Sequence, residues 1–236
     1  MFKKIIRSVL RKAGYDIRRA YVHTPWECDE FTSYYAIAAP RTLVSRDSCY
    51  VLERLFRQTL PVVGDIFECG VYKGGTAALF RSLIEETKCA KKLYLFDSFE
   101  GMPDTDPSKD WHNKGDFSDT SIEEVRKFVG GSEICIFRKG FIPDTFAGLS
   151  EIKISFAHID VDIYRSVTDC LKFVWPRISV GGAAVIDDYG LPTCPGARQA
   201  VDDFFQDGPA VPLCLHSGQA VIFKGPNQAQ SQRSRA

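Results

Sequence analysis

The sequence predicts an α/β fold with a Rossmann-like, mostly parallel seven-stranded sheet, a C-terminal antiparallel hairpin and a helical N-terminal extension. From residue 62 onward, apolar runs of strand length alternate with segments of helical periodicity. This alternation is typical of a parallel sheet that is covered by helices. A glycine-rich turn follows the first apolar run, and acidic residues end four of the runs. Such sheets bind their ligands at the carboxyl ends of the strands, so we expect the functional site there.

Composition limits the classes of protein that need to be considered. The 236 residues suit one domain with an extension, and 30 basic residues balance 30 acidic ones. The missing basic excess argues against a nucleic-acid partner. None of the eight cysteines forms a CxxC pair, so no zinc-finger or thioredoxin motif is present. We interpret the cysteines as reduced and the compartment as cytoplasmic.

Residues 1–14 have the pattern of a basic amphipathic helix. The segment is too short and too charged to span a bilayer, and it lacks the apolar core of a signal peptide. Two interpretations remain open: packing on the domain or on a second subunit, and weak contact with an anionic membrane surface. We assign residues 1–60 to a helical extension that serves oligomerisation or covers the acceptor, and we expect a homo-oligomer, most simply a dimer.

The rest of the extension contains two prolines and one helical pattern. Pro25 and Pro40 argue against a long helix over residues 20–44. A helix is expected at about 46–59, because its apolar residues share one face.

Residues 61–225 carry the alternating pattern. Strands are expected within 62–70, 91–99, 133–140, 154–162 and 181–190, helices within 74–87, 121–129, 164–175 and 195–206, and a hairpin from 211–216 and 219–225. Ser121 and Glu124 have the spacing of a capping box. The polar tail at 226–236 lacks periodicity and is expected to be disordered.

The turn at residues 68–76 is the candidate cofactor loop. Its glycines have the spacing GxxxGG rather than the GxGxxG of dinucleotide folds. An acid precedes the loop and suits a cationic amino-acid ligand such as S-adenosylmethionine, which carries an ammonium and a sulfonium but no phosphate. Asp97, at the end of the second strand, can accept hydrogen bonds from ribose hydroxyls. The alternative is that these acids only cap helices or lie exposed to solvent at the strand ends. The predicted cofactor-binding residues are Glu68, Gly70, Gly74, Thr76, Asp97 and Ser98.

Asp160, Asp187 and Asp188 follow the fourth and fifth strands. If these strands are neighbours, the three carboxylates converge and repel one another unless a cation lies between them. All-oxygen ligands favour Mg²⁺, Mn²⁺ or Ca²⁺ over Zn²⁺. The alternative is three separate, solvated acids.

Five segments together resemble the macrocin O-methyltransferase family over about residues 41–224. They are VVGDIFECGVYKGGTAALF, LYLFDSFEGMP, HIDVDIYRS, GGAAVIDDYG and CPGARQAVDDFF. Members of this family methylate sugar hydroxyls on macrolide and aminocoumarin antibiotics. The resemblance implies a class I methyltransferase fold, S-adenosylmethionine as methyl donor, and Mg²⁺ held by Asp160, Asp187 and Asp188. It also implies that Asp160 is the general base.

Several neighbouring residues have two possible roles. His158 is expected to support the site from behind, with direct contact to the site as the alternative. Asp162 either binds the cofactor or caps the next helix. Tyr164 and Tyr189 either line the acceptor pocket or pack. Trp111 and His112 lie in the polar stretch 101–118, which is either a mobile lid or a solvated loop.

Three other functions compete with the sugar O-methyltransferase. A catechol or phenol O-methyltransferase shares the fold, but its acidic triad usually ends in Asp-Asn rather than the Asp187-Asp188 found here. A non-catalytic S-adenosylmethionine-binding protein would not need three converging acids. A nicotinamide oxidoreductase is disfavoured by the glycine spacing.

Overall fold

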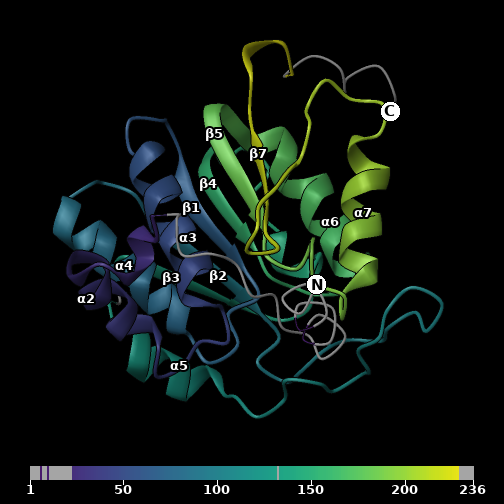
Figure 1. Ribbon diagram of the computed structural model, residues 1–236, viewed down its shortest axis with the longest axis horizontal. Coiled ribbons are helices and arrows are strands. Elements are labelled where there is room, and N and C mark those ends of the chain that lie inside the picture. The colour runs from purple at the N-terminus through teal and green to yellow at the C-terminus, as the bar shows by residue number, and fades with distance from the viewer. Residues whose placement is uncertain (1–5, 7–9, 11–22, 132, 229–236) are drawn as a thin grey trace.

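The seven-stranded sheet has the order β3-β2-β1-β4-β5-β7-β6, as seen in the computed structural model, which describes residues 6, 10, 23–131 and 133–228 (Figure 1). The pairs among the first five strands are parallel, whereas β7 is antiparallel to both β5 and β6. The predicted fold class and the C-terminal hairpin are therefore confirmed. The strands are β1 (Asp65–Cys69), β2 (Leu93–Asp97), β3 (Cys135–Lys139), β4 (Ile154–Ile159), β5 (Ile178–Ile186), β6 (Leu213–Cys214) and β7 (Ala220–Phe223).

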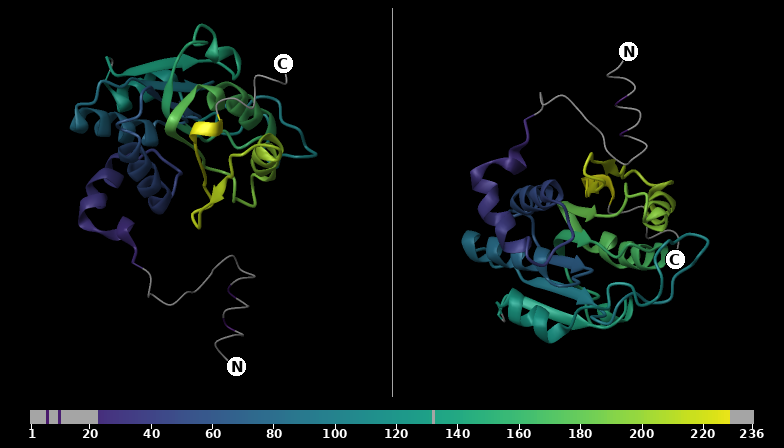
Figure 2. Two further views of the ribbon diagram at one scale, coloured as in Figure 1. Left: turned by 90° about the horizontal axis from the view of Figure 1, so that it is seen from above. Right: turned by 60° about the horizontal axis from the view of Figure 1, so that its bottom comes forward.

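Helices cover both faces of this sheet. One layer contains α2 to α5, and the other contains α6 and α7 (Figures 1 and 2). The α-helices are α2 (Asp29–Ala38), α3 (Arg46–Gln58), α4 (Gly75–Thr87), α5 (Ile122–Val129), α6 (Tyr164–Val174) and α7 (Pro195–Phe205). Four short 3-10 helices accompany them: η1 (Pro25–Glu27), η2 (Asp144–Phe146), η3 (Trp175–Arg177) and η4 (Pro226–Gln228).

Successive side chains along each strand enter opposite layers. In β1, Ile66 packs with α2 to α5, and Phe67 packs with α6 and α7. The same period of two places Phe156 in the first layer and Ala157 in the second. Both faces of the sheet are therefore buried, which explains why its strands read as continuous apolar runs.

The described part of the N-terminal extension belongs to the core of the domain. Phe31 of α2 and Leu52 and Phe56 of α3 are almost completely buried in the same cluster as residues of the sheet. The expected helix at 46–59 matches α3, whose N-terminus is capped by Ser45. The two prolines limit helix length but leave room for the ten residues of α2 between them. Apart from residues 6 and 10, the predicted basic helix at 1–14 lies outside the described residues.

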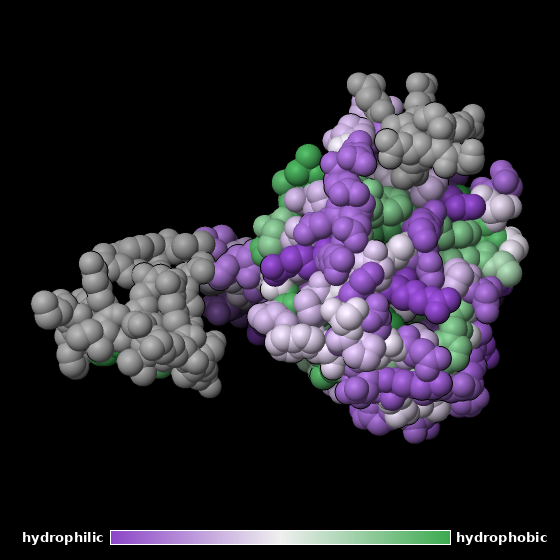
Figure 3. Space-filling view, turned by 90° about the vertical axis from the view of Figure 1, so that its right-hand side faces the viewer, coloured by the Kyte–Doolittle hydropathy of each residue, from purple (hydrophilic) through white to green (hydrophobic). Residues whose placement is uncertain are grey.

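Within the described residues, the last strand, β7, pairs with β5. The first three residues of the expected tail form η4, and residues 229–236 lie outside the described part. Within the described ranges, no helix combines the length and apolarity needed to cross a bilayer. Hydrophilic side chains cover most of the face shown in Figure 3, with apolar patches toward its edges.

Candidate functional site

A cavity of about 310 Å³ opens at the carboxyl ends of β1, β2, β4 and β5. It lies where the strand order reverses between β1 and β4, as expected for an open α/β sheet. Its volume is in the usual range for small-molecule sites. Seven of the predicted site residues line it, together with Asp162 and His112: Gly70, Thr76, Asp97, Ser98, Asp160, Asp187 and Asp188.

Gly70 allows the cofactor loop to cross close to β4. Its φ is +87°, and a Cβ atom there would lie 1.7 Å from the backbone oxygen of Asp160. Only glycine fits this crossing. Gly74 has a φ of +86° and caps α4 without lining the cavity, so Gly75 takes the place expected for it.

Asp97 lines the cavity and also holds the loop. Its Oδ2 accepts hydrogen bonds from the backbone N–H groups of Val71 (2.8 Å) and Tyr72 (2.9 Å). Its Oδ1 accepts one from the N–H of Phe99 (2.6 Å). The side chain of Ser98 donates to the carbonyl of Gly101 (2.7 Å), so Ser98 stabilises the turn at residues 98–101 as well as lining the cavity.

Glu68 lies beneath the cavity instead of lining it. It is fully buried, and its Oε1 is 3.2 Å from Nδ1 of His158. The two residues are register partners in β1 and β4, and their side chains enter the same layer. The expected direct contact between Glu68 and the cofactor therefore does not match its position, because the alternation of β1 turns its side chain into the core.

His158 connects Glu68 with the acids at the end of β5. Its Nε2 lies 3.4 Å from Oδ1 of Asp187, and the ring is fully buried. Burial alone lowers the pKa of His158, but hydrogen bonds with Asp187 and Glu68 raise it well above its ordinary value. A protonated ring can donate from both nitrogens, so His158 supports the site from behind, as the sequence predicted.

The three aspartates converge at one edge of the cavity. Asp160, Asp187 and Asp188 each offer a carboxylate oxygen, and these oxygens lie within 4.8 Å of one another. The parallel pairing of β4 with β5 produces this convergence. Asp187 also accepts a 2.7 Å hydrogen bond from Nε2 of Gln219, a buried hairpin residue that the sequence reasoning missed. Its only sequence signal is a polar residue at the start of an apolar strand.

Burial and mutual repulsion disfavour the ionised forms of these acids. Burial, followed by the charges of Asp187 and Asp188, raises the pKa of Asp160 well above its ordinary value. Burial, followed by the charges of Asp162 and Asp187, raises that of Asp188. A divalent cation would offset this repulsion, and three carboxylates are a donor set that suits a hard ion. The residues present therefore fit the predicted Mg²⁺ site.

The remaining candidates are distributed around the cavity. Asp162 has a φ of +56°, and its N–H donates to Oδ2 of Asp188 (3.0 Å). His112 lines the cavity, whereas Trp111 is 69% exposed. Tyr164 and Tyr189 do not line the cavity. Their hydroxyls contact Asp203 and Asp202 on α7, respectively.

Comparisons with known proteins point to one family. The model of the family described as macrocin-O-methyltransferase (TylF) matches residues 41–211. The 8-demethyl-8-(2,3-dimethoxy-alpha-L-rhamnosyl)-tetracenomycin-C 4'-O-methyltransferase of Streptomyces olivaceus is 30% identical over 78% of this chain and 73% of its own. The demethyldecarbamoylnovobiocin O-methyltransferase of Streptomyces niveus is 30% identical over 61% of this chain and 58% of its own.

A solved structure supports the fold independently. The O-methyltransferase NovP superposes with a TM-score of 0.71 at 24% identity, covering 78% of this chain and 82% of that one. At this identity the likeness concerns the arrangement of the sheet and helices.

Proposed function

Because the chain belongs to the macrocin O-methyltransferase family, and is therefore an S-adenosylmethionine-dependent O-methyltransferase, we propose that it methylates a sugar hydroxyl of a glycoside with the help of a divalent cation. The relatives named above support the substrate class, since the name of the Streptomyces olivaceus enzyme describes a rhamnosyl-bearing compound. The observation that carries the metal dependence is the convergence of Asp160, Asp187 and Asp188 at the cavity edge.

The cofactor loop and Asp97 would hold S-adenosylmethionine, whose sulfonium supplies an electrophilic methyl group. The backbone at Gly70 leaves room for a ligand, and Thr76 lines the same wall. Asp97 already accepts three backbone hydrogen bonds. A carboxylate has about four lone-pair sites, so Asp97 retains capacity for a ribose hydroxyl.

Asp160, Asp187 and Asp188 would hold the cation, which when bound favours the ionised form of an acceptor hydroxyl. Oδ1 of Asp187 accepts hydrogen bonds from both His158 and Gln219, and these two partners fix its rotamer. These partners allow Asp187 to keep its position while the acceptor enters.

Asp160 is the proposed general base. A sugar hydroxyl is a poor nucleophile until its proton is removed, and the carboxylate of Asp160 lines the cavity at the end of β4. Burial makes this carboxylate a better proton acceptor than an exposed one, because it raises its pKa. Binding donor and acceptor side by side supplies a further part of the rate.

The first test combines chelation with Asp160→Asn in a methyl-transfer assay on glycosides and nucleotide sugars. Excess EDTA should abolish turnover, and added Mg²⁺ should restore it. The Asn variant should lose about 10²–10⁴-fold in rate, because the general base is removed. Affinity for S-adenosylhomocysteine should persist, since its proposed contacts lie elsewhere.

Asp29→Asn is the matched control, because Asp29 is an exposed aspartate at the start of α2. This variant should retain wild-type turnover. Full activity in EDTA would exclude the metal mechanism. Methylation of catechols without turnover of any glycoside would overturn the substrate class and leave the methyltransferase chemistry in place.

A further inference from the structure

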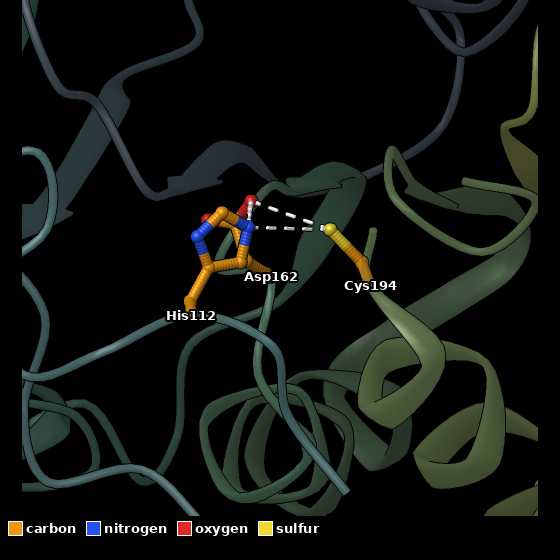
Figure 4. A group of neighbouring side chains, drawn as sticks. All are labelled: His112, Asp162 and Cys194. Carbon is orange, nitrogen blue, oxygen red and sulfur yellow. Dashed lines mark hydrogen bonds and ion pairs between the residues drawn. The ribbon is translucent and has the colours of Figure 1, made fainter. Parts of the chain in front are cut away.

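Beside the three aspartates, a second group of metal-binding side chains forms a near-equilateral triangle. His112 Nε2, Asp162 Oδ1 and Cys194 Sγ are each 3.7 Å from the other two. Figure 4 shows the three side chains pointing toward one another from separate segments of the chain. All three line the cavity. In a tetrahedral Zn²⁺ site with ordinary bond lengths, neighbouring N, O and S donors are separated by roughly 3.3–3.6 Å.

The imidazole of His112 is oriented as metal-binding histidines usually are. Its Nδ1 lies 3.3 Å from Oδ2 of Asp116. A carboxylate on Nδ1 places the proton there and leaves the lone pair of Nε2 directed toward Asp162 and Cys194. The site therefore has both its donor atoms and an outer partner that fixes one of them.

The thiol of Cys194 is also suitably placed. Cys194 is the N-cap residue of α7, and only 2% of its surface is exposed. Burial, followed by the charges of Asp188 and Asp162, raises the pKa of this thiol. A bound cation would therefore be needed to hold it as the thiolate. The other polar contact of the thiol is the hydroxyl of Thr193, at 3.6 Å.

The charges around the triangle leave room for a cation. Oδ2 of Asp116 and Oδ1 of Asp162 lie 3.3 and 3.7 Å from the two ring nitrogens of His112, and within residues 23–131 and 133–228 no lysine or arginine pairs with either acid. The imidazole, carboxylate and thiol, which all accept when deprotonated, thus face one another with no lysine or arginine paired to Asp162 in the described part of the chain.

We propose that His112, Asp162 and Cys194 form a second metal site, which takes Zn²⁺ through one nitrogen, one oxygen and one sulfur and leaves a fourth position open toward the cavity. The thiolate and imidazole distinguish this site from the all-oxygen site of Asp160, Asp187 and Asp188, because they select a softer ion. On binding, the thiol proton is released to solvent. The inference does not depend on the proposed sugar acceptor or on the metal dependence of methyl transfer.

Occupation of this site would join the loop at 101–118 to the body of the protein. His112 lies in that loop, Asp162 follows β4, and Cys194 is the N-cap residue of α7. A bound ion would link all three over the cavity and restrict the loop. Of the two roles left open for this loop, a bound ion would favour the lid, because it would hold the loop over the cavity.

The test uses Co²⁺ as a spectroscopic probe and Zn²⁺ as competitor, on the full chain in excess Mg²⁺. We expect one equivalent of Co²⁺ to give a thiolate-to-metal charge-transfer band that Zn²⁺ abolishes. Cys194→Ser should remove the band, and His112→Gln should weaken binding strongly. Asp116→Asn should weaken Zn²⁺ binding about 10–100-fold, the usual cost of losing a partner of a ligating histidine.

Cys214→Ser is the control, because Cys214 is an exposed cysteine on β6 outside the site. It should leave the band unchanged. Hydrogen exchange at residues 101–118 should slow on addition of Zn²⁺ in the wild type and not in His112→Gln, which keeps the thiol and avoids a change in the core. The proposal is overturned if the wild type gives no band, if the band survives Cys194→Ser, or if it depends on Cys214.

Discussion

Asp97 combines two roles in one side chain. Its three hydrogen bonds from backbone N–H groups hold the cofactor loop, and its remaining acceptor capacity faces the cavity. Sequence spacing predicted only the second role. A substitution therefore affects both cofactor affinity and the stability of the loop.

We predict that Asp97→Asn raises the Kd for S-adenosylhomocysteine about ten- to hundredfold. The reason is the loss of a charge-assisted hydrogen bond worth about 1.5–3 kcal/mol. Calorimetry measures the affinity, and urea unfolding measures the stability. Asp65→Asn is the control, since Asp65 also accepts a backbone hydrogen bond, from Lys92, but at the opposite end of β1. If the Asp97 variant loses stability but keeps its affinity for S-adenosylhomocysteine, Asp97 holds the loop and does not bind the cofactor.

Lys224 is a buried cation whose charge disfavours the fold. Its Nζ donates to the carbonyl of Trp175 (3.1 Å), and only 3% of the residue is exposed. Burial lowers the pKa of Lys224 to about 8. An unfolded lysine titrates near 10.4, so between about pH 8 and 10.4 the unfolded chain binds more protons at this residue. Stability contributed by Lys224 therefore rises with pH across that window and is lower below it.

We predict that the free energy of unfolding of Lys224→Met, relative to wild type, falls by roughly 1–3 kcal/mol between pH 7.5 and 10. The wild type gains stability as Lys224 loses its buried charge with rising pH, whereas the variant has no charge to lose. Urea unfolding at both pH values provides the measurement. Lys172→Met is the control, because Lys172 lies on the surface of α6. Its free energy of unfolding should change between pH 7.5 and 10 by the same amount as that of the wild type. Parallel pH profiles for wild type and Lys224→Met would contradict the lowered pKa.

At the scale of elements, β4, β5 and the β6–β7 hairpin meet at the acidic site. Strand alternation places Glu68, His158 and Asp187 on one side of three neighbouring strands. The hairpin adds Gln219, whose Nε2 donates to Asp187 and lies 3.5 Å from the carbonyl of Ser48 on α3. A long-range pairing between elements thus determines the orientation of Asp187.

We predict that Gln219→Leu lowers Mg²⁺ affinity about 10–100-fold, because Asp187 loses one of the two partners that orient it. Affinity for S-adenosylhomocysteine should remain at the wild-type value, since Gln219 is not a cavity residue. Mg²⁺ titration of activity and calorimetry separate the two effects. Gln206→Leu, exposed at the end of α7, should change neither. Equal Mg²⁺ affinity in the two variants would exclude a role for Gln219 in orienting Asp187.

At the scale of the whole molecule, the described surface retains apolar residues near the β5–β6 edge. Val180, Leu213 and Phe223 are each more than 40% exposed on adjoining strands. Residues 23–60 place side chains such as Phe31, Leu52 and Phe56 in the core, so we expect an interface through the extension to depend most on residues 1–22 and on such edges.

We predict a dimer, with a mass twice the 26.5 kDa of one chain in light scattering at micromolar concentration. A variant that lacks residues 1–22 should shift toward the monomer. Unchanged circular dichroism would show that this shift does not come from unfolding. A monomeric mass for the full chain would refute the assembly.

The sequence by itself determined the sheet, its hairpin and the acids at its carboxyl ends, because side-chain periodicity and turn residues act locally. It located Asp97, Asp160, Asp187 and Asp188 correctly at the cavity, since the end of a parallel strand is readable from its apolar run. Tertiary structure alone decided that Glu68 turns into the core toward His158 and that Gln219 binds Asp187. It also brought His112, 82 residues before Cys194 in the chain, next to that thiol. Such contacts depend on register and on loop paths, which packing across distant elements fixes and local pattern does not encode.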